Sequence, residues 1–238
     1  MRFKHLIFAI IQGAGLLACS SVDAVYVKTD RAVVSTDLEP DKGLEKMIAP
    51  YKNELSQEMD EVIGYASENL VNNRPEGSLG NFVVDATLSY LENREIIPTN
   101  QYICIMNTGG LRSSIAKGEI SIGDIYKLMP FDNTIVVTKL PISSFDSICN
   151  YLQHSGGEPI AGFSLKGNVC SLSHSVNNDT LYMVTSDYLF NGGDRMTFFE
   201  SNYSAKNTGF LLRDILMEYV KERDTIYPIL EGRITPDQ

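Results

Sequence analysis

Two glycine-containing turns carry the side chains of this sequence that are best suited to bind a ligand. The stretch "MNTGGLRSSI", residues 106–115, follows an apolar run and places Arg112 next to a pair of glycines. The stretch "SDYLFNGGDRMTFF", residues 186–199, leads from an apolar segment into a second glycine pair and then Asp194. Glycine pairs most often serve backbone geometry alone. They also let a ligand approach the backbone closely, and both interpretations stay open here.

Aromatic residues beside the turns indicate which class of ligand would fit. The turn "LMPFDNT", residues 128–134, places Phe131 between a helix and a strand. An aromatic residue beside a turn is usually part of the core, but Phe131 and Tyr188 together are suited to hold a planar ring. Asp194 is suited to accept hydrogen bonds from vicinal hydroxyls, and Arg112 to bind a phosphate with two parallel hydrogen bonds. A ring, a diol and an anion together describe a nucleotide.

Longer segments around these turns resemble a known family. "NTGGLRSSIAKGEISIGDIYKLMPFDNTIVV" resembles the 5′-nucleotidase C-terminal domain signature, N-x-G-G-[IL]-R, then G-x-I-[ST], then P-F-x-N. "DYLFNGGD" resembles its second signature, "GSLGNFVVDA" its early helix and "LEGRI" its ending. The resemblance covers about residues 55–235. It implies an α/β fold with a single domain, a four-layer α/β/β/α sandwich of the 5′-nucleotidase C-terminal domain type.

The resemblance also implies roles for individual residues, because this domain binds the substrate nucleoside in that family. Phe131 and Tyr188 would enclose the base, and Asp194 would hold the ribose. Asn107 and Arg112 would contact the polar part of the nucleotide. The other candidate substrate-binding residues are Gly109, Gly110, Asn133, Gly192, Gly193, Arg195 and Arg74.

Three of these positions depart from the family pattern. The family commonly has glycine and then an aromatic residue after G-G-D, whereas this chain has Arg195 and Met196. The Arg195 side chain would either add a phosphate contact or partly fill the pocket. Tyr188 replaces the usual phenylalanine and adds a hydroxyl at the ring edge. The family often has one or two arginines just before the L-G-N stretch. Arg74 lies near that stretch, but its position is shifted by one residue from theirs.

The sequence lacks the motifs of a catalytic metal centre. Complete 5′-nucleotidases have a separate metallophosphatase domain with a two-metal site and motifs such as D-x-H and G-N-H-[DE]. This chain has three histidines, of which His5 lies in the predicted leader. We interpret His154 as a residue at a helix C-terminus and His174 as a loop residue. The sequence therefore predicts no cofactor in this chain and no phosphate-ester hydrolysis by the chain alone.

These observations support three hypotheses about function. The first is the substrate-binding half of an enzyme in nucleotide catabolism, acting with a separate metallophosphatase chain that carries two divalent metals. The second is a non-catalytic nucleotide- or nucleoside-binding lipoprotein. The third is a structural remnant whose pocket Arg195 blocks, and the surviving candidate residues weigh against it. We favour the first, because a pocket of this type normally delivers its ligand to metals.

The N-terminal segment has the pattern of an export signal. Residues 1–18 have a basic start and then an apolar run shorter than the roughly 20 residues of a membrane span. "LLAC" fits a bacterial lipobox, in which Cys19 is acylated, although a plain secretory signal that contains a cysteine is the alternative. We expect a signal at 1–18, an acylated N-terminus and tether at 19–50, and the domain at 51–238. The lipid would anchor an exported protein to a membrane of the bacterial cell envelope.

Composition and cysteine count limit the partners. A formal net charge of −10 disfavours binding to nucleic acid, and 43% hydrophobic residues favour a globular core. Cys104, Cys149 and Cys170 cannot all pair with one another. We interpret them as buried thiols and assign them no chemistry.

Hydrophobic periodicity predicts the elements that must position these residues. Apolar residues at helical spacing predict helices at 79–93, 121–129, 142–153 and 208–223, with Ser121 as an N-cap. Apolar and β-branched runs predict strands at 101–107 and 133–140 and within 159–170 and 179–190. The tail at 227–234 closes the fold. Strands and helices alternate without a linker after residue 50, which indicates one α/β domain.

Overall fold

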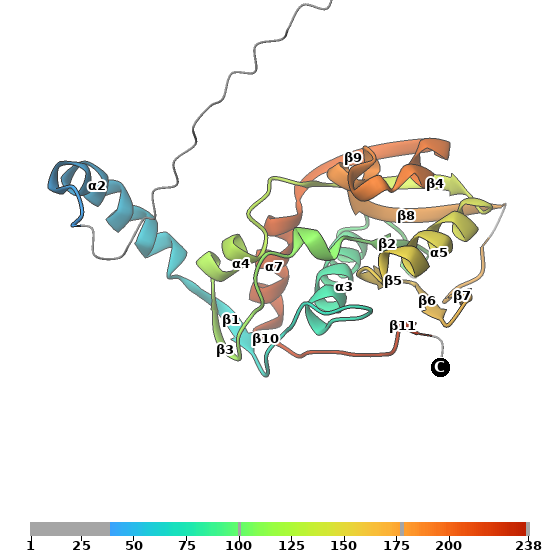
Figure 1. The fold of residues 1–238 in the computed structure, drawn as a ribbon, viewed down its shortest axis with the longest axis horizontal. Helices are drawn as coiled ribbons and strands as arrows, with labels where there is room; N and C mark the ends of the chain where they lie inside the picture. Colours follow the sequence, from blue (N-terminus) through green and yellow to red (C-terminus); the bar gives the residue numbers. More distant parts are fainter. Residues whose placement is uncertain (1–38, 100, 177–178, 237–238) are drawn as a thin grey trace, which may run out of the picture. The chain divides into compact units, whose positions relative to one another are not determined.

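The computed structural model describes residues 39–99, 101–176 and 179–236 (Figure 1). The predicted leader and Cys19 lie outside the described residues. The chain divides into two compact units, Met1–Lys46 and Met47–Gln238, and the candidate site belongs to the second. Helix α2 (Lys42–Met59) crosses the boundary between these units and begins inside the range expected to be a tether.

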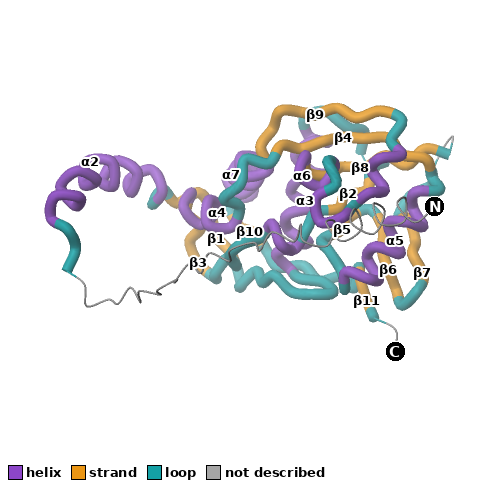
Figure 2. Tube along the Cα trace, turned by 45° about the horizontal axis from the view of Figure 1, so that its top comes forward, coloured by secondary structure: helices purple, strands orange, loops and turns teal. Residues whose placement is uncertain are grey.

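A five-stranded mixed sheet carries the segments that form the candidate site. Its strands lie in the order β5-β2-β8-β4-β9 (Figures 1 and 2). The bounds are Ile160–Ala161 for β5, Ile103–Ile105 for β2, Thr180–Ser186 for β8, Thr134–Pro141 for β4 and Ser204–Leu211 for β9. β2 runs parallel to β8, and the other neighbouring pairs are antiparallel.

Side chains of this sheet enter two separate hydrophobic clusters, because successive residues of a strand point to opposite faces. Ile103 and Ile105 pack in one cluster with Ile148 and Leu152 of α5. Cys104 packs in the other cluster with α3 and α7, and α3 lies against α7 (Figure 1). These helices are α3 (Ser78–Asn93), α5 (Ser144–Ser155) and α7 (Leu212–Arg223). Each fully buried aliphatic side chain contributes about 1.5–3 kcal/mol to this packing.

Two three-stranded sheets complete the second unit, in the orders β10-β1-β3 and β11-β6-β7. Their strands are β1 (Val62–Ala66), β3 (Gly118–Ser121), β10 (Thr225–Ile226), β6 (Phe163–Lys166), β7 (Val169–Leu172) and β11 (Ile234–Thr235). The short helices are α4 (Ile122–Leu128), α6 (Asp187–Phe190) and the 3₁₀ turns η2 (Thr108–Gly110), η3 (Gly193–Arg195) and η4 (Thr197–Ser201). The predicted α/β fold is confirmed, with the strands divided among three sheets.

Most predicted elements are present, and the differences have local causes. The helices at 79–93, 121–129 and 142–153 are confirmed, and Ser121 caps α4 in a reciprocal capping box with Asp124. The prediction that the helix at 208–223 begins at residue 208 was wrong, because residues 208–211 pair with β4 as the end of β9. Residues 187–190 form α6 rather than strand, since the Ser186 hydroxyl caps the Leu189 N–H.

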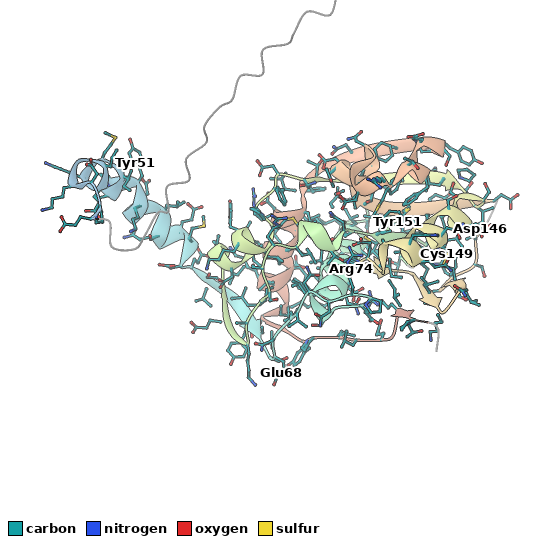
Figure 3. The ribbon with its side chains drawn as sticks, in the orientation of Figure 1. Tyr51, Glu68, Arg74, Asp146, Cys149 and Tyr151 are labelled. Carbon is teal, nitrogen blue, oxygen red and sulfur yellow. A yellow bond between two sulfur atoms is a disulfide. The ribbon has the colours of Figure 1, made fainter. Side chains whose placement is uncertain are left out.

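The interpretation of Cys149 and Cys170 as thiols was wrong, because the two residues form a disulfide between α5 and β7. Figure 3 labels Cys149 on α5. The sequence alone did not show that β7 returns to the side of α5. Cys104 is a buried thiol as predicted, and its burial raises its pKa. Within the described ranges, no helix is both long enough and apolar enough to cross a bilayer.

Candidate functional site

Strand directions bring four chain segments to one edge of the five-stranded sheet. β2 and β8 are parallel, so the residues that follow them leave at the same edge. β4 is antiparallel to β8, with Ile135 opposite Ser186, so the residues just before β4 reach this edge too. Leu212, at the start of α7, joins them, since its N–H donates to the Asn133 carbonyl oxygen at 2.9 Å. The glycine turns and the Phe131 turn therefore meet in space.

These segments enclose a cavity of about 450 Å³, a size typical of small-molecule sites. Eight predicted substrate-binding residues line it: Asn107, Gly109, Gly110, Arg112, Phe131, Asn133, Tyr188 and Asp194. The other lining residues were not predicted from the sequence; they are Met106, Leu111, Met129, Ser186 and Leu212. Four of these are buried apolar residues at the ends of elements, so no polar pattern distinguished them from the core. Gly192 and Gly193 line a neighbouring cavity that shares Asn133 and Tyr188 with the first.

The two aromatic residues of the cavity expose much of their rings. Phe131 is 43% exposed and Tyr188 is 48% exposed, although both lie beside buried core residues. A ring that served only as a core residue would be buried. Both rings are therefore available to a planar ligand group.

Asp194 is held by two neutral donors across the mouth of the cavity. Asn107 Nδ2 donates to its Oδ2 at 2.6 Å, and the Tyr188 hydroxyl donates to its Oδ1 at 2.9 Å. This hydrogen bond and the carboxylate's negative charge raise the pKa of Tyr188. Asp194 has a φ of 51°, in the left-handed region that non-glycine residues seldom adopt. The backbone thus turns sharply to aim this carboxylate at the cavity.

The second glycine of each pair makes room for a functional side chain. A Cβ at Gly110 would lie 2.8 Å from Asn107 Oδ1, and one at Gly193 would lie 2.5 Å from Cε1 of the Tyr188 ring. Gly192 has a φ of 87° and open space around it, so its role is conformational. Gly192 therefore serves backbone geometry, one of the two purposes that the sequence left open, whereas Gly110 and Gly193 make room for side chains of the protein itself.

Arg112 presents a cation to the cavity. Its Nη1 donates to the Gly109 carbonyl oxygen at 3.2 Å, and its guanidinium carbon lies 5.8 Å from the centroid of the Phe131 ring. None of the ion pairs among the described residues involves Arg112. Its charge is available to an anion that enters beside Phe131.

The structure does not bring Arg74 and Arg195 to this cavity. Arg74 forms an ion pair with Glu158 at 2.6 Å and lies beside the C-terminal end of α5 (Figure 3). Its candidate role as a substrate-binding residue is therefore not supported by its position. Arg195 is exposed and is not among the lining residues, so it does not fill the pocket.

The Phe131 turn is held by Arg213, which no sequence motif marked as part of the site. Arg213 of α7 is only 7% exposed, and it donates to Asp132 Oδ1 at 2.7 Å and to the Phe131 carbonyl oxygen at 3.5 Å. Its guanidinium also lies 4.3 Å from the centroid of the Tyr126 ring. The Arg213 Nε has no hydrogen-bond partner among the described residues. A buried charge that contacts a turn in this way fixes the backbone that presents Phe131.

The histidines lie where the sequence placed them. His154 is in the last turn of α5, where its Nδ1 is 2.6 Å from the Asn150 carbonyl oxygen, and His174 follows β7. Among the described residues, no group of three or more His, Cys, Asp or Glu side chains is placed to hold a metal ion.

Comparison with known proteins relates part of the chain that lines this cavity to a known family. Residues 62–141 match the family model described as 5′-nucleotidase, C-terminal domain. The chain is similar to the trifunctional nucleotide phosphoesterase protein YfkN of Bacillus subtilis, with 26% identity over 87% of this chain and 16% of that protein. It is also similar to the 5′-nucleotidase of Diplobatis ommata, with 26% identity over 67% of this chain and 33% of that protein.

A solved structure shares the fold as well. The 5′-nucleotidase precursor of Thermus thermophilus matches with a TM-score of 0.66 and 27% identity, over 82% of this chain and 43% of that chain. The chain thus spans less than half the length of each of these relatives. The family model over residues 62–141, the relatives and the solved structure agree: this chain is similar to the C-terminal domain of 5′-nucleotidases and shares its fold.

Proposed function

We propose that this domain binds the nucleoside part of a nucleotide in the cavity at the sheet edge. The observation that carries the proposal is that Phe131, Tyr188, Asp194 and Arg112 line one cavity, although they come from three separate segments. The base stacks on the two aromatic rings, an interaction worth about 1–3 kcal/mol for each base. The ribose diol donates to the Asp194 carboxylate, and the phosphate pairs with Arg112.

The domain acts as the substrate-binding half of an enzyme, together with a metallophosphatase on a separate chain. One feature supports this part of the proposal. Only His154 and His174 lie outside the predicted leader, in a chain with no D-x-H or G-N-H motif. The partner would supply two divalent metals that activate water and stabilise the leaving oxygen.

The protein is exported and anchored to the bacterial cell envelope by a lipid on Cys19. The Cys149–Cys170 disulfide supports an oxidising compartment, since such bonds persist mainly outside the cytosol. Replacement Cys19→Ser then releases the protein from the membrane fraction. Equal partitioning of both forms would reduce the lipobox to an ordinary cleavage site.

A second candidate function is a nucleotide- or nucleoside-binding lipoprotein without chemistry. It is favoured by the presence of an aromatic pair, a carboxylate and a cation among the residues of this chain that line the cavity. Both candidates predict binding, and they differ in whether the bound nucleotide is then hydrolysed. Phosphate release from AMP on mixing with a secreted metallophosphatase that lacks this domain supports the enzyme half, and release by this chain alone contradicts it.

Calorimetry with adenine, adenosine and AMP tests the binding that both candidates share. Tyr188→Ala weakens all three by about five- to a hundredfold, the loss of one stacking platform. Asp194→Asn weakens adenosine more than adenine, because only adenosine offers a diol. Arg112→Ala weakens AMP more than adenosine, and added salt narrows that difference. If none of the three ligands binds at millimolar concentration, the proposal is wrong.

A further inference from the structure

We propose that Glu158 and Asn72 are positioning residues that hold the glycine loop, residues 107–112, in the geometry that binds the ligand. The inference rests on the proposed nucleoside site, because this loop supplies Asn107, the glycine pair and Arg112 to it. Neither Glu158 nor Asn72 lines the cavity. They act on it through the backbone of Thr108.

Both backbone polar groups of Thr108 are bound by side chains from distant parts of the chain. Its N–H donates to Glu158 Oε2 at 2.7 Å, across 50 residues of sequence. Its carbonyl oxygen accepts from Asn72 Nδ2 at 3.0 Å, across 36 residues. The same Asn72 amide group also donates to the Leu111 carbonyl oxygen at 3.2 Å. One side chain therefore binds the turn at both Thr108 and Leu111.

Glu158 is itself fixed on the side away from the loop. The residue is 4% exposed, and its Oε1 accepts from Arg74 Nη2 at 2.6 Å. Arg74 in turn donates to the Gly157 carbonyl oxygen at 2.6 Å and to the Ser155 carbonyl oxygen. Burying a carboxylate is costly unless it is paired and hydrogen-bonded, and here both of its oxygens are used. One oxygen secures the ion pair, and the other reaches the loop.

The loop needs such support because of its composition. A glycine pair has the largest backbone freedom of any dipeptide, so Gly109 and Gly110 do not fix the turn by themselves. Asn107, just before Thr108, must also reach Asp194 across the cavity. Small displacements of a positioned group reduce its contribution strongly. Anchoring Thr108 therefore sets the places of both Asn107 and Arg112.

Two variants and two controls test the inference on the purified protein. Asn72→Asp is isosteric, but it removes the amide donors and faces the loop carbonyl groups with a carboxylate. Glu158→Ala removes the acceptor for the Thr108 N–H, whereas Glu158→Gln keeps an acceptor and loses only the charge. Asp85→Asn is the matched control, because Asp85 accepts from Arg233 at 2.8 and 2.7 Å and does not line the candidate cavity.

The readouts are hydrogen–deuterium exchange of residues 106–112, adenosine affinity and melting temperature. We expect Asn72→Asp and Glu158→Ala to speed exchange in this loop and to weaken adenosine binding, each by about tenfold, the value of a lost hydrogen bond to a charged or backbone group. Glu158→Gln should retain most of the loop's protection. Asp85→Asn should lower the melting temperature without changing loop exchange or affinity.

The result that overturns the inference is a lower melting temperature in both variants with loop exchange unchanged, as in the Asp85→Asn control. If Glu158→Ala does not fold, the loop exchange and adenosine affinity of Asn72→Asp alone decide whether the inference holds. Failure of the wild-type chain to bind adenosine would refute the proposed function. The exchange measurement would then still show whether these two residues hold the loop.

Discussion

Asp194 has both carboxylate oxygens engaged before any ligand enters, by the Asn107 amide and the Tyr188 hydroxyl. A diol that binds there must replace at least one of these donors. The neutral donors keep the carboxylate oriented without cancelling its charge, and the loss of one of them on binding costs about 0.5–1.5 kcal/mol. On the proposed binding mode, the hydroxyl of Tyr188 therefore competes with the ligand for Asp194.

We expect Tyr188→Phe to strengthen adenosine binding by about two- to tenfold, the value of one hydrogen bond. The ring that stacks on the base is kept, while one Asp194 oxygen becomes free for the ribose. Adenine affinity should not change, because adenine has no diol. Calorimetry with the two ligands checks this, and weaker adenosine binding would show that the hydroxyl helps the ligand instead.

The hydrogen bond between Tyr188 and Asp194 should depend on pH. The hydrogen bond to Asp194 and its negative charge raise the pKa of Tyr188 above the ordinary value of 10.0. The interaction is therefore fully present below that pH and is lost as pH rises through the raised folded-state pKa. Ultraviolet titration of the wild type against Tyr188→Phe isolates this tyrosine. In an Asp194→Asn background its titration should move to lower pH, and an unchanged titration would contradict the pairing.

Among the elements, α7 and the turn before β4 act as one unit through Arg213. The sequence presents "LLRDILMEYV" as an ordinary amphipathic helix, and Arg213 looks like a solvent-facing residue within it. In the structure it is buried and binds the turn 81 residues earlier in the sequence. The orientation of Phe131 thus depends on a helix far along the chain, whose first residue, Leu212, also binds the Asn133 carbonyl oxygen in the same turn.

Replacement Arg213→Met should weaken adenine and adenosine to the same extent, because it loosens the base platform and leaves the diol contact intact. Hydrogen bonds to charged groups are worth about 1.5–3 kcal/mol, and the loss of binding free energy should not exceed this value. Arg94→Met is the control, since Arg94 pairs with Glu218 of the same helix on an exposed surface. Equal effects of the two substitutions would refute a specific role for Arg213.

Local signals account for the elements that the sequence predicted correctly. α4 has its capping box within four residues, and α5 buries Ile148, Cys149 and Leu152 at helical spacing. β9 was missed because it pairs with β4 about 70 residues away and has a largely exposed burial pattern without alternation. Gly162 and Gly167, both with positive φ, divide the stretch at 159–170 into three short strands that periodicity did not separate.

For the candidate site, motifs located the groups that face the cavity but not the groups that hold them. Asn107, Arg112, Phe131, Tyr188 and Asp194 lie in recognisable turns. The supporting residues carry no local mark: Glu158 stands in "GGEPI", which reads as a loop, and Asn72 stands in a polar stretch. Their roles depend on contacts across 50 and 36 residues, which a single sequence does not reveal.

For the molecule as a whole, the disulfide is a source of stability that is separate from the site. Cys149 and Cys170 are 21 residues apart and join α5 to β7, and neither lines the cavity. Closing a loop of this size stabilises a fold by about 3 kcal/mol in the chain-entropy description. Binding and stability should therefore respond independently to reduction.

We expect the Cys149→Ala, Cys170→Ala double variant to melt at a lower temperature than the wild type, with unchanged adenosine affinity. A reducing agent should lower the melting temperature of the wild type and leave the double variant unaffected. Thermal unfolding with and without reductant measures both effects. A wild-type melting temperature that does not respond to reductant would contradict the pairing of these cysteines.

The parallel pairing of β2 with β8 has a consequence for the order in which the protein acquires its properties. The Asn107–Asp194 bond closes over 87 residues, and the cavity also needs Leu212. Such distant contacts form late, because the chain must lose much conformational freedom before they are made. A chain that emerges from a membrane pore N-terminus first therefore exposes Arg112 and Phe131 well before Tyr188 exists beside them. The candidate cavity is therefore complete only once Leu212 has joined it, and a fragment truncated before Asp194 would lack part of its lining.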